Sequence, residues 1–366
     1  MYTTEDLCVY LFYEYHHANI AEMHHVWYEE DMFENVKELA DVTLETLVEN
    51  ETLCTSYNIF RLMYLCRTSS LAAEIQNNFV EVLELLRQQP KHAQRTPEWY
   101  ETRHNLITAS SAYKMFGTPS ERNTLIVEKC APEKERPPLS LYDARHWGVR
   151  YEPVSTMYYT YTYAAEIEEF GCLVHPTLSF LGASPDGINI GAASEAYGRM
   201  LEIKNPVSRV ITGVPITEYW IQMQMQMEVC NIDACDFLET QFVEYENHES
   251  FVSDGSFTLS ANGKAKGLIL LFCQDGKFTY EYAPYAGSEE DVALWESKEK
   301  EKDTVREYIK TIYWRLDEIS CVLVERNKMW FEEHKESMRQ FWQTVCEERE
   351  NNEWTKRVPI KKTPTW

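Results

Sequence analysis

The sequence predicts an α/β protein in which a mixed central β-sheet is flanked by helices and preceded by a helical N-terminal extension. Three observations predict this fold. Within residues 1–90, apolar side chains recur at helical spacing without Gly or Pro breaks, as in residues 36–48 and 79–86. From about residue 172, short apolar stretches alternate with turn residues, which indicates strands. After about residue 288 the chain is highly charged and has a helical pattern to about residue 351.

The expected organisation has three parts. Residues 1–90 form the helical extension, residues 91–287 form the core, and residues 288–366 form C-terminal helices that end in a basic tail. Within the core, the expected strands cover residues 171–176, 179–183, 200–204, 237–245 and 267–272.

Residues 222–227 alternate strictly between Gln and Met, and this period-two pattern by itself indicates a strand. Gln and Met are good helix formers, however, and neither belongs to the β-branched or aromatic residues that strands favour. We therefore expect a helix over residues 218–230.

The composition is that of a folded globular protein. Of the 366 residues, 44% are hydrophobic and 26% are charged, which excludes a disordered chain or a low-complexity fibre. The apolar runs are far shorter than the roughly 20 residues of a bilayer helix, and the N-terminus lacks a basic segment before an apolar one. We therefore expect an intracellular protein with no membrane partner. The 10 cysteines include no CxxC pair, which favours buried free thiols over zinc or iron–sulfur ligands.

The net charge of -24 argues against tight non-specific binding of nucleic acid. The acidity lies mainly in the flanks, because residues 1–94 hold 5 Lys and Arg against 16 Asp and Glu, whereas residues 95–230 hold 12 against 16. The net charge therefore does not exclude a local positive groove. Its candidate side chains are Lys114, Arg145, Arg150, Arg199 and Arg209.

Two carboxylates and a lysine lie in an order that suits metal chemistry. Asp186 follows a predicted strand, and period-two geometry places Glu202 and Lys204 on one face of the next strand. Mg²⁺ prefers oxygen ligands and keeps several waters, so two carboxylates and a backbone carbonyl suffice to hold it. Taken alone, however, Glu-x-Lys is more often a solvated strand face with an ion pair, and Pro-Asp-Gly is more often a simple turn.

The stretch from about Arg95 to Val229 resembles the lambda-exonuclease / YqaJ-type viral recombinase family of the PD-(D/E)xK nuclease superfamily. Five weak blocks occur in the family's order, and their co-occurrence over a little more than a third of the chain makes the resemblance specific. The blocks are residues 95–103 with 107–110, then 147–152, 184–187, 201–204 and 219–224.

The resemblance implies a role for each side chain of a catalytic site. Asp186 and Glu202 correspond to the metal ligands, and Lys204 corresponds to the catalytic lysine. Glu152 completes the acidic cluster, at a second metal or through water, and Gln222 supports the site from the following helix. The cofactor implied is Mg²⁺, with Mn²⁺ as its expected substitute.

Arg103 and Ser110 resemble the family's pocket for the 5′-phosphate of a DNA end. The chemistry agrees, because a guanidinium makes bidentate contacts to phosphate and a hydroxyl adds one more. Each of these side chains also has a purely structural interpretation. Arg103 could lie on a surface helix, Glu152 could be a charge at a helix N-terminus, and Gln222 could be a polar residue of a core helix.

The family's known activity implies a Mg²⁺-dependent 5′→3′ exodeoxyribonuclease with a restriction-endonuclease-like core, which acts on double-stranded DNA ends in viral or phage recombination or repair. Its usual partner is a single-strand-annealing protein, and its setting is the inside of a host cell. Family oligomers range from rings to monomers, so no oligomeric state is implied. The alternatives are a structure-specific or nicking endonuclease on the same fold and a non-catalytic DNA-binding module.

Overall fold

The computed structural model describes residues 79–90, 96–132, 141, 144–302 and 305–358. The chain divides into two compact units, Met1–Glu84 and Leu85–Trp366, and the second contains the sheet. The first predicted helix, residues 36–48, lies outside the described residues, as does most of the helical extension. The second predicted helix is confirmed, because residues 79–87 are helical.

The second unit contains two sheets and the helices that cover them. The strands are β1 (Ile107–Thr108), β2 (Ile167–Glu168), β3 (Leu173–Val174), β4 (Leu181–Ala183), β5 (Gly187–Asn189), β6 (Met200–Lys204), β7 (Ala234–Glu244), β8 (Lys266–Gln274), β9 (Lys277–Tyr282) and β10 (Glu307–Glu325). The helices are α4 (Pro97–His104), α5 (Ala109–Phe116), α6 (Pro119–Cys130), α7 (Ala144–Tyr163), α8 (Thr217–Cys230), α9 (His248–Ser253), α10 (Glu289–Lys302), α11 (Lys328–Asn351) and the 3-10 helix η2 (Glu353–Arg357).

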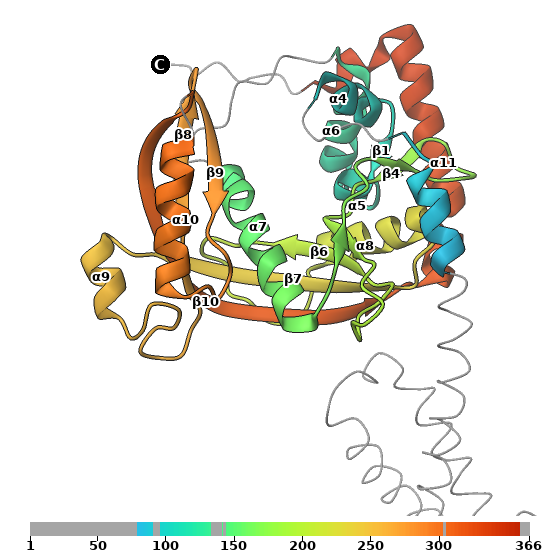
Figure 1. The fold of residues 1–366 in the computed structure, drawn as a ribbon. Helices are drawn as coiled ribbons and strands as arrows, with labels where there is room; N and C mark the ends of the chain where they lie inside the picture. The colour runs from blue at the N-terminus through green and yellow to red at the C-terminus, as the bar shows by residue number, and fades with distance from the viewer. Residues whose placement is uncertain (1–78, 91–95, 133–140, 142–143, 303–304, 359–366) are drawn as a thin grey trace, which may run out of the picture. The chain divides into compact units, whose positions relative to one another are not determined.

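The larger sheet is mixed, as the sequence predicts. Its seven strands run in the order β2-β5-β6-β7-β10-β8-β9, and the pair β6–β7 is parallel while its other pairs are antiparallel. A smaller sheet holds β1, β4 and β3. Figure 1 shows β7 and β10 as two long curved strands, with β8, β9 and α10 at one end and α4, α6 and α11 at the other. The α/β fold class is therefore confirmed.

Helix α7 packs along one face of the larger sheet. Its Tyr151 and Val154 are buried against Phe242 of β7 and Trp314 of β10, and Tyr151 stacks on Phe242 with ring centroids 4.4 Å apart. Nearer its C-terminus, Tyr159 joins a second cluster with residues of β6 and β7. Burying aromatic rings of this size removes much apolar surface from water, so this helix–sheet contact contributes strongly to stability.

The helix predicted over residues 218–230 is confirmed as α8. All three Met side chains of the Gln–Met alternation are buried, and so are all three Gln side chains, so α8 is enclosed on every side. Gln224 clamps α8 to the C-terminal part of the chain, because its Nε2 donates to the Glu325 carbonyl at 2.9 Å and its Oε1 accepts from Asn327 N at 2.6 Å. Both polar ends of the buried Gln224 amide are therefore paired with the backbone.

The prediction that residues 288–351 are helical is wrong over Glu307–Glu325, which forms the 19-residue strand β10. Ile312, Trp314 and Leu316 are buried and their neighbours are not, which is the period of a strand with one buried face. Irregularities in its pairing at Tyr308/Lys310 and Leu316/Glu318 are of the kind that bend strands. The C-terminal segment is thus helix–strand–helix, and its strand lies in the middle of the larger sheet.

The strand predictions are confirmed in place, although the first two strands are shorter than expected, at Leu173–Val174 and Leu181–Ala183. The seven described cysteines are free, and four of them are buried. Of the basic tail, Arg357 is described, and its NH2 and Nε pair with Glu348. In the described residues, no helix is both long enough and apolar enough to cross a membrane.

A buried hydrogen bond between α7 and β7 gives a test of this packing. Tyr159 donates its hydroxyl to Asp236 Oδ2 at 2.6 Å, and Asp236 is 3% exposed. We expect Tyr159→Phe to lower the free energy of unfolding by about 1.5–3 kcal/mol, because a buried carboxylate loses one donor. Urea denaturation measures this loss. The control Tyr161→Phe, on the exposed side of α7, should change it by less than about 0.5 kcal/mol. Equal effects of the two variants would contradict the assignment.

Candidate active site

One pocket of about 210 Å³ brings together all seven side chains that the sequence nominates. They come from four helices, one strand and one turn. Arg103 lies on α4, Ser110 on α5, Glu152 on α7 and Gln222 on α8, whereas Asp186 lies in the turn before β5. Glu202 and Lys204 lie on β6. The gathering is a finding of the structure, and the chemical roles of these residues remain predictions.

Glu202 is the most deeply buried charged group of the pocket, at 1% exposed. Its Oε1 accepts hydrogen bonds from Lys204 Nζ and, at 2.6 Å, from Gln222 Nε2. Its Oε2 accepts from Gln226 Nε2 at 2.7 Å. Three donors therefore compensate the loss of water around this carboxylate, and they fix the direction of both oxygens.

Asp186 is placed opposite Glu202 by the antiparallel pairing of β5 with β6, in which Gly187 faces Leu201. Its Oδ2 accepts from the Ile203 N–H at 2.6 Å, and the described residues give its Oδ1 no hydrogen-bond partner. Burial raises the pKa of Asp186 well above its ordinary value, and the negative charges of Glu202 and Glu152 raise it further. The carboxylates therefore repel one another, and a cation among them would relieve this repulsion.

Lys204 supplies the positive charge next to these carboxylates. Burial lowers the pKa of Lys204, but Glu202 and Asp186 outweigh burial and raise the pKa above its ordinary value. Its ammonium also lies 5.0 Å from the ring centroid of Tyr219 on α8. The lysine is consequently held as a cation by two carboxylates and an aromatic face.

Arg103 also lines the pocket. Its NH1 donates to Ser184 Oγ at 3.1 Å and its NH2 donates to Ser110 Oγ at 3.2 Å. The guanidinium also stacks over the ring of Trp99, with Cζ 4.3 Å from the centroid. The Trp99 indole Nε1 is buried and has no hydrogen-bond partner among the described residues. Cationic and hydroxyl groups with an unused N–H are the chemistry of an anion pocket.

Lys129 supports Arg103 from behind. It is 8% exposed, and its Nζ donates to the Arg103 carbonyl at 2.8 Å. Burial, and then the charge of Arg103, lower the pKa of Lys129 to about 8. The end of α4 is therefore fixed to α6, which limits the movement of the backbone that carries the guanidinium.

Glu152 reaches the pocket from α7. The three predicted metal ligands, Asp186, Glu202 and Glu152, nevertheless do not form a single metal-binding cluster. Throughout the described residues, no group of three or more His, Cys, Asp and Glu side chains is arranged so that it could hold a metal ion. Because Mg²⁺ keeps several waters, Asp186 and Glu202 can hold such an ion without Glu152 as a direct ligand. The oxygen donors and their mutual repulsion fit a hard divalent cation.

Five basic side chains are the sequence candidates for a positive groove. The structure describes four of these side chains, and the four do not form such a groove. The side chain of Arg145 lies outside the described residues. Each of the others is paired with a carboxylate, in the pairs Lys114–Glu128, Arg150–Glu244, Arg199–Asp236 and Arg209–Glu239. Ion pairing weakens the long-range field of these groups. The basic side chains that line the pocket are Arg103 and Lys204, and Lys204 is itself paired with Glu202.

Sequence reasoning missed five residues that line the pocket: Trp99, Ser184 and Gln226, and the apolar Ala109 and Ile203. Gln226 had a usable signal, because it lies four residues after Gln222 and therefore on the same face of the predicted helix. Trp99 and Ser184 lie inside blocks that carried the resemblance, but no local pattern marks them as pocket residues.

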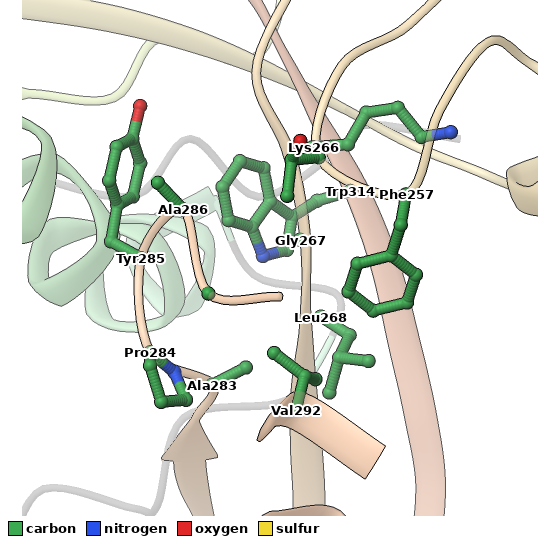
Figure 2. Close-up of a pocket in the computed structure, with 12 residues that line it drawn as sticks. Phe257, Lys266, Gly267, Leu268, Ala283, Pro284, Tyr285, Ala286, Val292 and Trp314 are labelled. Atoms are coloured by element: carbon green, nitrogen blue, oxygen red, sulfur yellow. The ribbon is translucent and has the colours of Figure 1, made fainter. Parts of the chain in front are cut away.

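A second pocket lies between β8, the segment before α10, and Trp314 of β10 (Figure 2). Its volume of about 10 Å³ leaves room for at most one water. Trp314 packs closely against the backbone of Gly267, since a Cβ added at Gly267 would lie 2.4 Å from the indole ring. Lys266 donates to three backbone carbonyls, of Phe251, Asp254 and Ser256, and so serves the structure. This pocket is a packing defect, and the first pocket is the candidate active site.

Comparison with known proteins gives one family and several relatives. Residues 98–233 match the family model described as the YqaJ-like viral recombinase domain. An uncharacterized protein of Acanthamoeba polyphaga mimivirus, R354, is 30% identical over 308 residues, which cover 74% of this chain and 56% of that protein. The chain thus spans little more than half the length of this relative.

Two solved structures are also similar. One is an alkaline exonuclease, LHK-Exo, from Laribacter hongkongensis, with 20% identity, a TM-score of 0.43, and coverage of 71% of this chain and 98% of that one. The other is LHK-Exo in complex with dAMP, with 19% identity and the same TM-score and coverage. The family match spans the catalytic candidates from α4 to α8, including Arg103, Asp186, Glu202 and Gln222. The predicted resemblance to the YqaJ-type viral recombinase family is therefore confirmed over residues 98–233.

Proposed function

We propose that this protein is a divalent-metal-dependent deoxyribonuclease, and that it degrades duplex DNA from its ends in the 5′→3′ direction. The observation that carries the proposal is the pocket that Asp186, Glu202 and Lys204 line together with Arg103 and Ser110. The first group suits hydrolysis of a phosphodiester, and the second suits a terminal phosphate. The match to the recombinase family supports a substrate of DNA and a setting in viral or phage recombination or repair, with a single-strand-annealing protein as partner.

Asp186 and Glu202 are the side chains that would hold a divalent cation, Mg²⁺ or Mn²⁺, with Glu152 acting directly or through water. Their oxygen chemistry and the partnerless Asp186 Oδ1 support this assignment. When bound, such a cation supplies charge for the phosphodiester and lowers the pKa of a water.

Lys204 serves as the positioned cation of the site. Because Glu202 and Asp186 raise its pKa, the side chain is an ammonium at neutral pH and donates hydrogen bonds. In that form it orients the attacking water and offsets negative charge that develops on the phosphate. Gln222 and Gln226 keep the Glu202 carboxylate in place by their own donors.

Arg103 binds the 5′-phosphate of the end that is being degraded. Its guanidinium is held on three sides, by Ser184, Ser110 and the Trp99 ring, so little side-chain freedom is lost when an anion binds. The unpartnered Trp99 N–H offers a further donor. A phosphate anchored at Arg103 would set how far the chain of nucleotides extends toward Asp186 and Glu202.

The first prediction concerns the metal and the catalytic side chains. We expect cleavage of linear duplex DNA with Mg²⁺ or Mn²⁺ and none in excess EDTA, because the donors are oxygens. Asp186→Asn and Lys204→Met should each lower the rate by at least about 100-fold, whereas the exposed Glu195→Gln should leave it unchanged. Digestion of end-labelled DNA measures the rate, and circular dichroism checks the fold.

Full activity in EDTA, or in either catalytic variant, would contradict the metal site. A closed circular duplex should stay intact under the same conditions, and its cleavage would instead indicate an endonuclease.

The second prediction concerns the phosphate pocket. We expect a 5′-phosphorylated end to be degraded about 10- to 150-fold faster than a 5′-hydroxyl end, because a charge-assisted contact contributes about 1.5–3 kcal/mol. Arg103→Gln should abolish this preference, while Arg339→Gln, an exposed arginine of α11, should retain it. Single-turnover rates on the two ends measure the ratio. Equal rates in the unmodified protein, or a preference that survives Arg103→Gln, would sink the pocket assignment.

A further inference from the structure

The wall of the candidate active site holds two buried polar atoms that lack a partner among the described residues. One is the donor Trp99 Nε1, and the other is the acceptor Gln226 Oε1. The donor suits the phosphate that Arg103 would bind. The acceptor cannot be satisfied by a phosphate, because phosphate oxygens are acceptors themselves, so Gln226 needs a different partner.

The orientation of the Gln226 amide is fixed by its neighbours. Gln226 is 1% exposed, and its Nε2 donates to Glu202 Oε2 at 2.7 Å and more weakly to the Ser184 carbonyl at 3.4 Å. A flipped amide would bring two oxygens to 2.7 Å and would lose both hydrogen bonds. Oε1 is therefore the atom without a partner, and an unpaired buried acceptor costs free energy unless something donates to it.

The partner must be a donor small enough to reach a buried atom beside Glu202. A water bound to a divalent cation fits, because the cation polarises its O–H groups and makes them strong donors. Mg²⁺ keeps several such waters when only one or two carboxylates hold it. Gln226 and the cation would share the same carboxylate, since Gln226 Nε2 holds Glu202 Oε2.

We propose that Gln226 is a positioning residue whose Oε1 accepts a hydrogen bond from a cation-bound water. The proposal rests on the metal site of the proposed function. Gln226 then has two tasks: its Nε2 fixes the carboxylate and its Oε1 fixes the hydration of the ion. Outer partners of this kind strengthen metal binding although they do not touch the metal.

Gln222 is a matched control on the same helix. Its Nε2 also makes one hydrogen bond to Glu202, at 2.6 Å to the other oxygen, so Gln222→Met and Gln226→Met each remove one donor to the same carboxylate. The two variants differ in the unpartnered acceptor, which Gln226→Met removes and Gln222→Met keeps. A difference between them therefore reports on Oε1.

The test measures Mn²⁺ binding by the full chain without DNA, by electron paramagnetic resonance of free Mn²⁺. We expect Gln226→Met to weaken Mn²⁺ affinity about 10-fold or more, and Gln222→Met to weaken it clearly less. Melting in EDTA should be similar for the two variants, because each loses one short hydrogen bond to Glu202 and Gln226→Met loses in addition only the long contact to the Ser184 carbonyl. If Gln226 had a purely structural role, Gln226→Met would change the melting temperature, but Gln226→Met and Gln222→Met would not differ in Mn²⁺ affinity.

A second variant, Gln226→Glu, separates the two tasks. It keeps oxygen acceptors in a side chain of the same size but loses the donor to Glu202, so we expect it to bind Mn²⁺ more tightly than Gln226→Met. The charge-matched control is Gln222→Glu, which places a carboxylate beside the other oxygen of Glu202. We expect Gln226→Glu to bind Mn²⁺ more tightly than Gln222→Glu, whereas the two Glu variants would bind Mn²⁺ equally if Gln226 only supported Glu202.

Equal affinities of Gln226→Glu and Gln222→Glu, or of Gln226→Met and Gln222→Met, would overturn the role of Gln226 while leaving the metal site in place. Failure of the unmodified protein to bind Mn²⁺ would overturn the metal site and this proposal together. Should one variant of Gln226 not fold, the other still decides between the two roles, by comparison with the matching variant of Gln222.

Discussion

A carboxylate that is almost fully removed from water must be surrounded by donors, and Glu202 imposes this requirement on the architecture around it. Its partners come from β6 and from α8, so the strand and the helix must hold a fixed register. Helix α8 can present two Gln side chains to one carboxylate because they are four residues apart on one face. The third Gln, Gln224, faces elsewhere and ties α8 to the residues that follow β10.

The same requirement explains the distribution of charge around the pocket. The protein has a net charge of -24, and the basic side chains near the central strands form ion pairs with carboxylates of the sheet. Arg209, for example, pairs with the fully buried Glu239, and Arg150 pairs with Glu244. A polyanion that approaches this protein therefore meets little long-range attraction. The basic side chains that line the pocket, Arg103 and Lys204, therefore act on a polyanion mainly at close range.

Much of the catalytic region could be predicted from the sequence, because its blocks are short, ordered and chemically distinctive. The helix over 218–230 was predicted because the helix propensity of Gln and Met outweighed their strand-like alternation. The strand β6 was predicted from a short apolar stretch between turn residues. The strand β10 was missed because charged residues surround it, although Ile312, Trp314 and Leu316 alternate as a buried face. The ion pairs that remove the basic groove join residues 14 to 94 positions apart, and no local pattern reports such contacts.

Strand β10 lies between β7 and β8, although it follows both of them in the chain. During synthesis, β7 and β8 emerge first and have no pairing with each other, so each keeps an open hydrogen-bonding edge until residue 325 has left the ribosome. Unpaired edges of this length are templates for association with other chains. Because Gln224 finds its backbone partners only at Glu325 and Asn327, the helix that carries the active-site glutamines settles at the same late moment. A nascent chain cut short before β10 would lack both the strand that joins β7 to β8 and the backbone partners of Gln224, so the sheet and its contact with α8 are completed together, late in synthesis.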